Sequence, residues 1–155
     1  SYIWNIPGNT PLTGDRDGDG YKEAGVFRAS GANWFFDYDL DGKTEKLFLW
    51  GANGDIPLTG DWDGKGVTDI ARYRPSTGRW YFDYDLDGTT DKAFKWGANG
   101  DIPQTGDWNG NGVTDIARYR PSTGRWYFDY FRDGTTDRTF KWGEKNNKPL
   151  TGHWV

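Results

Sequence analysis

Six short segments of the chain carry oxygen-bearing side chains at alternate positions around a glycine. They follow the form Asp-x-Asp/Asn-x-Asp/Asn-Gly-x-x-Asp/Glu and occupy residues 15–23, 37–45, 61–69, 83–91, 107–115 and 129–137. Alternate side chains of such a tight loop point toward its centre, a main-chain carbonyl serves at the seventh position, and the sixth-position Gly permits the sharp turn. Because Ca²⁺ takes about six to eight oxygen ligands, this spacing predicts calcium sites.

The candidate ligands are the side chains at alternate positions and the seventh-position carbonyl of each loop. They are Asp15, Asp17, Asp19, Tyr21, Glu23, Asp37, Asp39, Asp41, Lys43, Glu45, Asp61, Asp63, Val67, Asp69, Asp83, Asp85, Asp87, Thr89, Asp91, Asp107, Asn109, Asn111, Val113, Asp115, Asp129, Asp133, Thr135 and Asp137. The loops at 15–23, 37–45 and 83–91 are complete, so the sequence predicts three or more Ca²⁺ per chain.

The other three loops depart from the pattern. The loop at 107–115 keeps its oxygens but loses two charges, which predicts weaker binding. Lys65 stands where an oxygen is expected and brings its ammonium near the carboxylates, and Phe131 removes another oxygen. Asp-Gly and Asn-Gly pairs also form ordinary hairpin turns, but a turn does not require the third and fourth acids. Mg²⁺ suits these loops less well because it demands octahedral geometry.

The loops belong to a repeat of 46 residues. Residues 51–96 and 97–142 align without a gap and differ at seven positions, and residues 5–50 form a more diverged copy. Residues 1–4 and 143–155 are partial copies. Self-similarity at this period is typical of propeller blades and stacked arrays. We therefore expect one repeat domain over 1–155, with unpaired strands at both ends that must be covered, paired or tolerated.

Each repeat predicts short β-strands. Residues 67–74 and 79–84 flank a Pro-x-x-Gly turn and form a hairpin, with further strands at 93–96 and 102–108. No sustained helical period occurs. The sequence thus predicts an all-β fold of three antiparallel, propeller-blade-like repeats in an open array, because three blades are too few for a closed ring.

The ten Trp residues fall at three positions of the repeat. One position holds Trp4, Trp50, Trp96 and Trp142; the second holds Trp34, Trp80 and Trp126; the third holds Trp62, Trp108 and Trp154. Aromatic rings that recur in register within strands pack mainly between repeats, although such rings also form sugar-binding platforms. We expect these rings to form most of the core.

Residues 60–75 and 80–88 resemble the FG-GAP/VCBS-type repeats of prokaryotic surface and extracellular proteins. The resemblance covers nearly the whole chain. It implies propeller-like blades, calcium in the loops and an extracellular or cell-surface location. It implies no single activity, because such repeats occur in adhesins, lectins and matrix proteins. Lys65, Phe131 and the low number of repeats depart from the family pattern.

Composition and charge exclude several classes of function. The net charge of −4 argues against nucleic-acid binding, and no apolar stretch is long enough to span a membrane. The chain has no Cys, and its one histidine, His153, lies two residues from the C-terminus. The carboxylates fall almost entirely in the loops, so we expect no enzymatic activity. The start at Ser1 fits a cleaved secreted precursor or the loss of an initiator Met, and calcium favours the former.

Two functions remain for such a chain. The partial repeats at both ends favour a structural building block that self-assembles through its terminal strands into a filament or a closed oligomer. The alternative is a calcium-dependent, lectin-like adhesion module that binds extracellular glycans through repeated Trp, Asp and Asn side chains. An exposed Trp beside a calcium ion would favour the second function.

Overall fold

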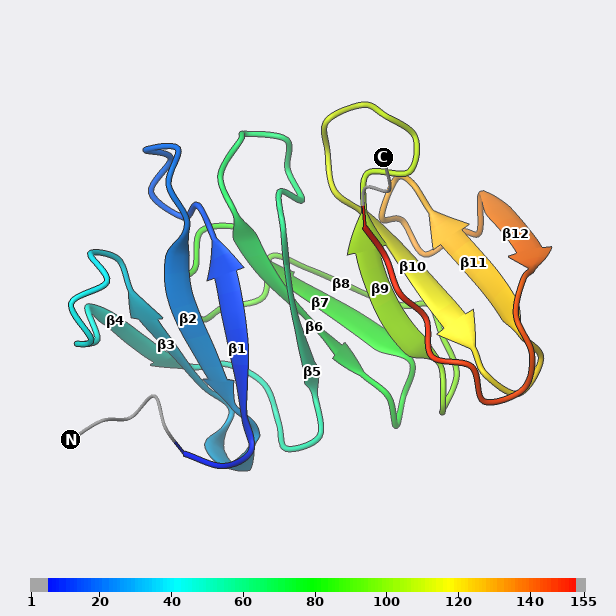
Figure 1. The fold of residues 1–155 in the computed structure, drawn as a ribbon, viewed down its shortest axis with the longest axis horizontal. Helices are drawn as coiled ribbons and strands as arrows, with labels where there is room; N and C mark the ends of the chain where they lie inside the picture. The colour runs from blue at the N-terminus through cyan, green and yellow to red at the C-terminus, as the bar shows by residue number, and fades with distance from the viewer. Residues whose placement is uncertain (1–5, 153–155) are drawn as a thin grey trace.

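The computed structural model describes residues 6–152, which form three four-stranded antiparallel sheets (Figure 1). We call them blades 1 to 3. Blade 1 contains β1 (Asn9–Gly14), β2 (Glu23–Arg28), β3 (Asn33–Asp37) and β4 (Lys46–Leu49). Blade 2 contains β5 (Ile56–Gly60), β6 (Asp69–Arg74), β7 (Arg79–Asp83) and β8 (Lys92–Lys95). Blade 3 contains β9 (Ile102–Gly106), β10 (Asp115–Arg120), β11 (Arg125–Asp129) and β12 (Arg138–Lys141).

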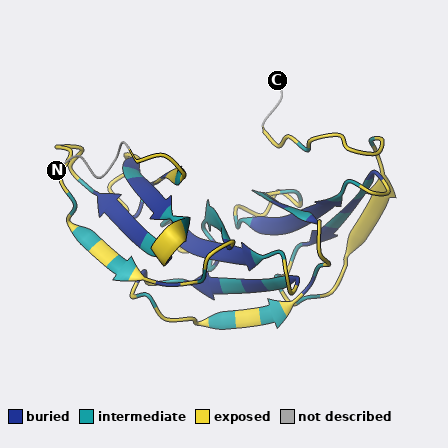
Figure 2. Cartoon of the chain, turned by 90° about the horizontal axis from the view of Figure 1, so that it is seen from below, coloured by how far each residue is buried: buried dark blue, intermediate teal, exposed yellow. Residues whose placement is uncertain are grey.

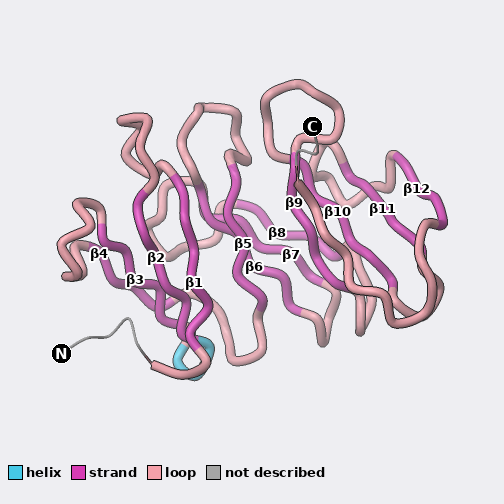
Figure 3. Tube along the Cα trace, viewed as in Figure 1, coloured by secondary structure: helices cyan, strands magenta, loops and turns pink. Residues whose placement is uncertain are grey.

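The predicted all-β repeat fold is confirmed. Within each blade the strands pair in chain order, and the predicted hairpin is β6 with β7, where Tyr73 lies opposite Trp80. The described residues contain a single short 3-10 turn, Ala29–Gly31, and none of their helices could cross a membrane (Figure 3). The first strands of adjacent blades contact one another, β1 with β5 and β5 with β9, and the three blades form an open array.

Large aromatic rings fill each blade, and the central strands that carry them are buried (Figure 2). Trp80 of β7, for example, packs against Tyr73, Phe82 and Trp96 at centroid distances of 5.0, 6.4 and 6.1 Å. The predicted Trp core is confirmed for Trp34, Trp50, Trp62, Trp80, Trp96 and Trp126. Trp108 is only half-buried and Trp142 is exposed. Trp4 and Trp154 lie outside the described residues.

The same contacts recur at both boundaries between blades. The indole N–H of Trp50 donates to the hydroxyl of Thr90 at 3.0 Å, and Trp96 donates to Thr136 at the same distance. Leu86 of blade 2 is buried in the core cluster of blade 1. Because each contact joins equivalent positions of successive repeats, every blade presents one face to the preceding blade and the opposite face to the next.

Buried ion pairs add to these boundaries at positions that the sequence did not single out. Asp55, just before β5, accepts hydrogen bonds from Arg72 and Arg74 at 2.6 and 2.7 Å. The Arg72 guanidinium also stacks over the Trp50 ring of blade 1, 4.6 Å from its centroid. Burial would raise the pKa of Asp55, but the hydrogen bonds from Arg74 and Arg72 outweigh it and hold that pKa below its ordinary value.

The boundary between blades 2 and 3 has the same arrangement, which we call the clamp: one aspartate accepts hydrogen bonds from two arginines, and one of these arginines stacks on a Trp of the preceding blade. Asp101 accepts hydrogen bonds from Arg118 at 2.6 Å and Arg120 at 2.7 Å, and Arg118 stacks over Trp96 at 4.8 Å. Blade 1 has Asn9 and Val26 at the equivalent positions of Asp101 and Arg118. Each clamp therefore accompanies a Trp from a preceding blade. A comparison of the repeats shows Asp and Arg at these two positions only in blades 2 and 3, each of which follows another blade. This difference could have predicted the clamps from the sequence.

Asp101→Asn should destabilise the chain by about 3 kcal/mol, because it leaves the buried Arg118 and the partly buried Arg120 without their counter-charge. The folded pKa of Asp101 is lowered by the Arg120 and Arg118 hydrogen bonds that outweigh its burial. The clamp therefore stabilises fully above the unfolded pKa of about 4, and its contribution is lost as pH falls through the lower folded pKa. Urea midpoints of the wild type and Asp101→Asn should differ at pH 7 and converge as the pH falls through the lowered pKa of Asp101. Glu144→Gln, an exposed change of the same charge, is the control.

Candidate metal centre

All six acidic loops lie at the same end of their sheets. The loops at 15–23, 61–69 and 107–115 join the first and second strands of each blade, and the loops at 37–45, 83–91 and 129–137 join the third and fourth. Because the strands are antiparallel and pair in chain order, both kinds of loop emerge at one edge (Figure 1). The fold therefore gathers the candidate ligands into a row along one rim.

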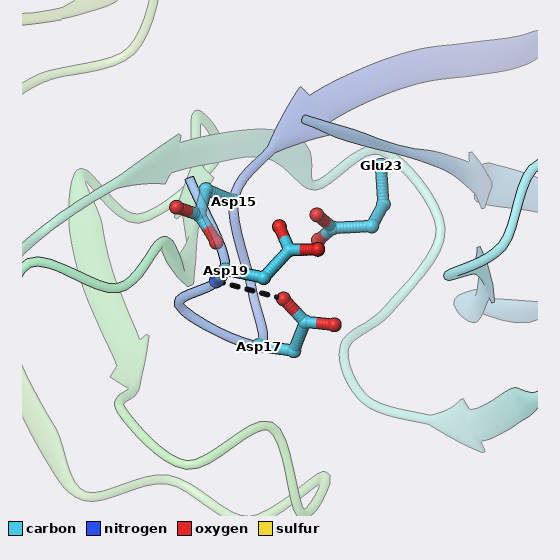
Figure 4. A group of neighbouring side chains, drawn as sticks. All are labelled: Asp15, Asp17, Asp19 and Glu23. Carbon is cyan, nitrogen blue, oxygen red and sulfur yellow. Dashed lines mark hydrogen bonds between the residues drawn. The ribbon is translucent and has the colours of Figure 1, made fainter. Parts of the chain in front are cut away.

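Four loops bring three or four carboxylates together, with ligand oxygens within 4.8 Å of one another. The clusters are Asp15, Asp17, Asp19 and Glu23; Asp37, Asp39, Asp41 and Glu45; Asp61, Asp63 and Asp69; and Asp83, Asp85 and Asp91. Figure 4 shows the first of these, in which the side chains converge from both ends of the loop. Like charges at this separation favour a cation between them.

The first acid of each loop fixes the turn. Asp15 accepts hydrogen bonds from the main-chain N–H groups of Gly18 at 2.7 Å and Gly20 at 2.9 Å. Asp61 makes the same two bonds with Gly64 and Gly66. Gly20 has φ of +92°, a conformation that side chains other than Gly rarely adopt, so the sixth-position Gly is required for this turn.

The last acid of each loop closes it. Its carboxylate accepts the N–H of the second loop residue in all six loops, at distances between 2.6 and 3.0 Å. In the first loop, Glu23 accepts from Arg16 in this way. The sequence predicts this acid only as a metal ligand. The structure adds that it also ties the loop entrance to the start of the following strand.

The loop at 37–45 shows the clearest need for a cation. Asp37 is buried, and its Oδ2 accepts the N–H of Gly42 at 2.9 Å. Its Oδ1 is buried and has no hydrogen-bond partner among the described residues. A buried carboxylate oxygen without a partner costs free energy that a bound cation would recover. The donors are carboxylate oxygens alone, which fits Ca²⁺ rather than a metal that prefers nitrogen or sulfur.

Burial works against ionisation at the base of the loops. Burial, reinforced by the charges of Asp63 and Asp61, raises the pKa of Asp69 to about 7. Burial also raises the pKa of Asp83 to about 6. A nearby cation favours the charged form of a carboxyl group and so opposes both shifts. A bound metal would therefore favour the ionised form of both aspartates.

The clusters differ in two respects from the pattern of complete loops. Asp87 lies outside the cluster of its loop. Its carboxylate instead accepts hydrogen bonds from Thr89, from the main-chain N–H at 2.7 Å and from the side-chain hydroxyl at 2.5 Å. The loop at 61–69 does gather three acids, although Lys65 occupies an oxygen position. As expected from the sequence, the Lys65 ammonium lies near the carboxylates, 2.7 Å from Asp63.

Blade 3 keeps the loop geometry without the acidic clusters. The first acids, Asp107 and Asp129, still accept the N–H groups of Gly112 and Gly134 at 2.8 Å. Among residues 6–152, neither loop of this blade brings three acids together. Asn109 and Asn111 replace charged ligands in one loop, and Phe131 replaces an acid in the other. The structure thus separates the turn, which all blades share, from the acidic clusters of blades 1 and 2.

A scan against protein-family models found no match for the chain. Searches for similar curated proteins and similar solved structures returned no match either. The resemblance to FG-GAP/VCBS-type repeats therefore stays a prediction from the sequence.

Asp37→Asn should remove one calcium ion per chain, because it takes a charge from a four-carboxylate cluster. Asp129→Asn is the matched control, since Asp129 holds the same turn by the same bond but lies in a loop without such a cluster. Calorimetric titration should give one ion fewer for Asp37→Asn and an unchanged number for Asp129→Asn. Equal numbers for Asp37→Asn and the wild type would contradict the assignment.

Proposed function

We propose that the chain is a calcium-binding structural repeat protein, stabilised by three or more Ca²⁺ and acting outside the cell or at its surface. The observation that carries the proposal is the set of four carboxylate clusters along one rim, each with ligand oxygens within 4.8 Å. Calcium-binding extracellular modules work at Kd values of about 0.1–1 mM, which suits surface loops that exchange with solvent. Calcium in this role supplies positive charge and is coordinated by the oxygens of the loop.

If calcium ordered one loop, hydrogen bonds between the loops of adjacent blades would also restrict the neighbouring loop. The N–H of Thr68, in the loop of blade 2, donates to the carbonyl of Asp15 in the loop of blade 1. Thr114 of blade 3 donates to Asp61 of blade 2 at 2.8 Å. Asp15 and Asp61 thus each fix their own turn and, through their carbonyls, contact the next blade. A loop held by a cation would hold its neighbour in place as well.

A non-catalytic role agrees with how the acids are engaged. The first and last acids of every loop accept main-chain N–H groups, so they are committed to holding the turn. His153 lies outside the described residues. We propose neither an enzymatic nor a nucleic-acid-binding function.

Calcium removal should lower the melting temperature by more than about 10 °C, because several ions that bind only the folded chain each contribute about 2–3 kcal/mol at a hundredfold excess over Kd. Melting followed by circular dichroism in calcium and in excess chelator measures this change. Magnesium at the same concentration is the control and should restore less of the loss. A melt that is unchanged in chelator would count against structural calcium.

We further propose that copies of the chain assemble end to end, with blade 1 of one copy against blade 3 of another. Leu86 is 5% exposed at the boundary of blades 1 and 2, whereas the equivalent Leu40 of blade 1 is 61% exposed. Trp50 and Trp96 are 5% exposed, whereas Trp142 of blade 3 is 71% exposed. The two outer faces therefore carry the side chains that the inner boundaries bury.

The outer face of blade 1 is also more apolar than its counterparts. Phe48 faces blade 2, where it lies under Gly88, so Leu47 and Leu49 point to the opposite face of the strand. Both are exposed, and the equivalent residues of blade 2 are Ala93 and Lys95. Because Ala93 and Lys95 stay exposed at the boundary of blades 1 and 2, Leu47 and Leu49 form an apolar patch beyond the contacts that this boundary repeats, and an exposed apolar patch favours association.

The segment after β12 supports the involvement of terminal strands. Residues 149–152 repeat the Pro-Leu-Thr-Gly of β1, and this segment lies beside β9, where the Thr151 hydroxyl donates to Gln104 at 3.3 Å (Figure 1). It forms no strand, and Leu150 is exposed, whereas the equivalent Leu12 of β1 is buried. Its main chain is therefore open to pairing with a second copy. The sequence predicts that the terminal strands take part in self-assembly, but residues 1–5 and 153–155 at the two ends lie outside the described residues.

Trp142→Ala and Leu49→Asp should each weaken calcium-dependent self-association by tenfold or more, because both change exposed side chains on the two outer faces. Sedimentation velocity in calcium and in chelator measures the association. Tyr21→Ala, which removes an exposed side chain from a loop tip, is the control. A wild-type chain that stays monomeric with calcium at every concentration would contradict the assembly.

The second candidate function is glycan binding. A groove of about 460 Å³ on blade 3 is lined by Tyr119, Trp126 and Trp142, together with Asn147 and Lys148. Aromatic faces beside polar groups are the usual chemistry of sugar sites. Glycan-array binding that Trp142→Ala abolishes, from a chain that sediments as a monomer, would favour this function over assembly.

A further inference from the structure

Arg132, in the second loop of blade 3, reaches into the first loop of the same blade. Its Nη1 donates to Asp115 Oδ1 at 3.3 Å and to the carbonyls of Thr114 and Tyr130 at 3.0 Å. The Asp115 carboxylate is fully buried, and the Arg132 side chain is only 15% exposed. Asp115 is also the last acid of its loop, the one that closes it through the N–H of Trp108. A positive charge thus contacts a carboxylate that in blades 1 and 2 belongs to an acidic cluster.

Among the described residues, no guanidinium contacts the carboxylate of the equivalent acid in the other blades; Arg16 of blade 1 is buried nearby but donates to the main-chain carbonyl of Glu23, at 3.4 Å. Leu40 and Leu86 stand at the positions equivalent to Arg132, and all three residues adopt the left-handed conformation, with φ of 60°, 58° and 54°. The backbone is therefore the same and only the side chain differs. Lys65 in blade 2 does not replace Arg132, because it is 76% exposed and pairs with Asp63 rather than with the buried Asp69. An exposed ammonium of this kind contributes little to stability.

A second substitution beside Arg132 changes the charge in the same direction. Phe131 stands where blade 2 has Asp85, so blade 3 exchanges an acid for a neutral residue and a neutral residue for a base at adjacent positions. In the first loop, Asn109 replaces Asp63 and donates from its amide to Asp115 Oδ1 at 3.3 Å. Asp115 Oδ1, the oxygen that would face a metal, is therefore already occupied by two donors.

We propose that Arg132 is a built-in counter-ion that takes the place of a metal ion in the loop at 107–115. The inference rests on the proposed calcium binding in blades 1 and 2 and concerns its distribution along the chain. Blade 3 balances its buried carboxylate with a guanidinium and needs no cation in this loop, whereas blades 1 and 2 leave their clusters to calcium. Arg132 thereby excludes a metal ion from this one loop.

If Arg132 takes the place of a metal ion, replacing it should allow the loop at 107–115 to bind calcium. Without the guanidinium, the loop still offers oxygens from Asp107, Asn109, Asn111 and Asp115 and from the Val113 carbonyl. Their turn is already formed, since Asp107 accepts the N–H groups of Gly110 and Gly112 at 2.7 and 2.8 Å. Leu is the natural replacement for Arg132, because Leu40 and Leu86 adopt the same backbone conformation in the other blades.

Arg132→Leu, tested in the full chain, should bind one calcium ion more than the wild type by calorimetric titration. In excess chelator its melting temperature should be about 10 °C lower than that of the wild type, because Asp115 is left buried without a counter-charge. Calcium should restore that loss. Lys145→Leu, which removes the same charge from an exposed position, should change neither quantity. Adding Asp115→Asn to Arg132→Leu should abolish the extra ion.

The outcomes separate this inference from the function on which it rests. If the wild type binds calcium and Arg132→Leu binds the same number of ions with an unchanged melt in chelator, the counter-ion role is wrong and the calcium sites of blades 1 and 2 stand. If the wild type binds no calcium, the proposed function is wrong. In that case a lower melt of Arg132→Leu in chelator would still support the pairing with Asp115, and an equal melt would overturn it.

Discussion

A carboxylate removed from water is costly unless donors or a cation replace the lost hydration, and each blade buries such groups at its edges. The fold meets this constraint in three ways. Asp55 and Asp101 receive paired arginines at the boundaries between blades. The first and last acids of the loops receive main-chain N–H groups. In the clusters of blades 1 and 2 several carboxylates still face one another, and Asp37 Oδ1 has no hydrogen-bond partner among the described residues, so a cation is the chemically consistent partner.

This constraint also explains how small sheets can form one array. Each blade has four short strands and an aromatic core, and a lone sheet of this size buries little area. The boundary contacts supply the rest, because Trp50 donates to Thr90 and lies beneath Arg72. Arg72 is in turn held by Asp55. The aromatic packing and the buried charge are therefore parts of one contact, and neither is complete without the neighbouring blade.

The repeat made much of the fold predictable from sequence. The 46-residue period and the two β-prone runs around Pro75–Gly78 predict one hairpin of the same kind in each repeat. In blade 2 the structure contains this hairpin as β6 and β7. Loop spacing likewise predicts which acids converge, since alternate positions around Gly20 face one centre. These features are local, so short-range geometry determines them.

Features that depend on the neighbouring blade or on the neighbouring loop were less accessible. Trp50, Trp96 and Trp142 share one sequence position, yet Trp142 is exposed because no described blade covers it. Asp87 has the spacing of a ligand, but the nearby Thr89 hydroxyl competes for its carboxylate. Arg132 contacts Asp115 across 17 residues, a pairing that no periodicity within a single loop encodes.

The acidic charge of the loops is graded along the chain, which gives the two outer faces different chemistry. The loops of blades 1, 2 and 3 contain eight, seven and five acidic residues. Under the proposed calcium binding, blade 1 would therefore depend most on bound cations, whereas in blade 3 the Arg132 guanidinium pairs with the buried carboxylate of Asp115. In an end-to-end assembly these two blades meet, so calcium would act on one side of each joint only. Thr68 of blade 2 donates to the carbonyl of Asp15 and Thr114 of blade 3 donates to that of Asp61, so a cation that ordered one loop would also restrict the loop of the next blade.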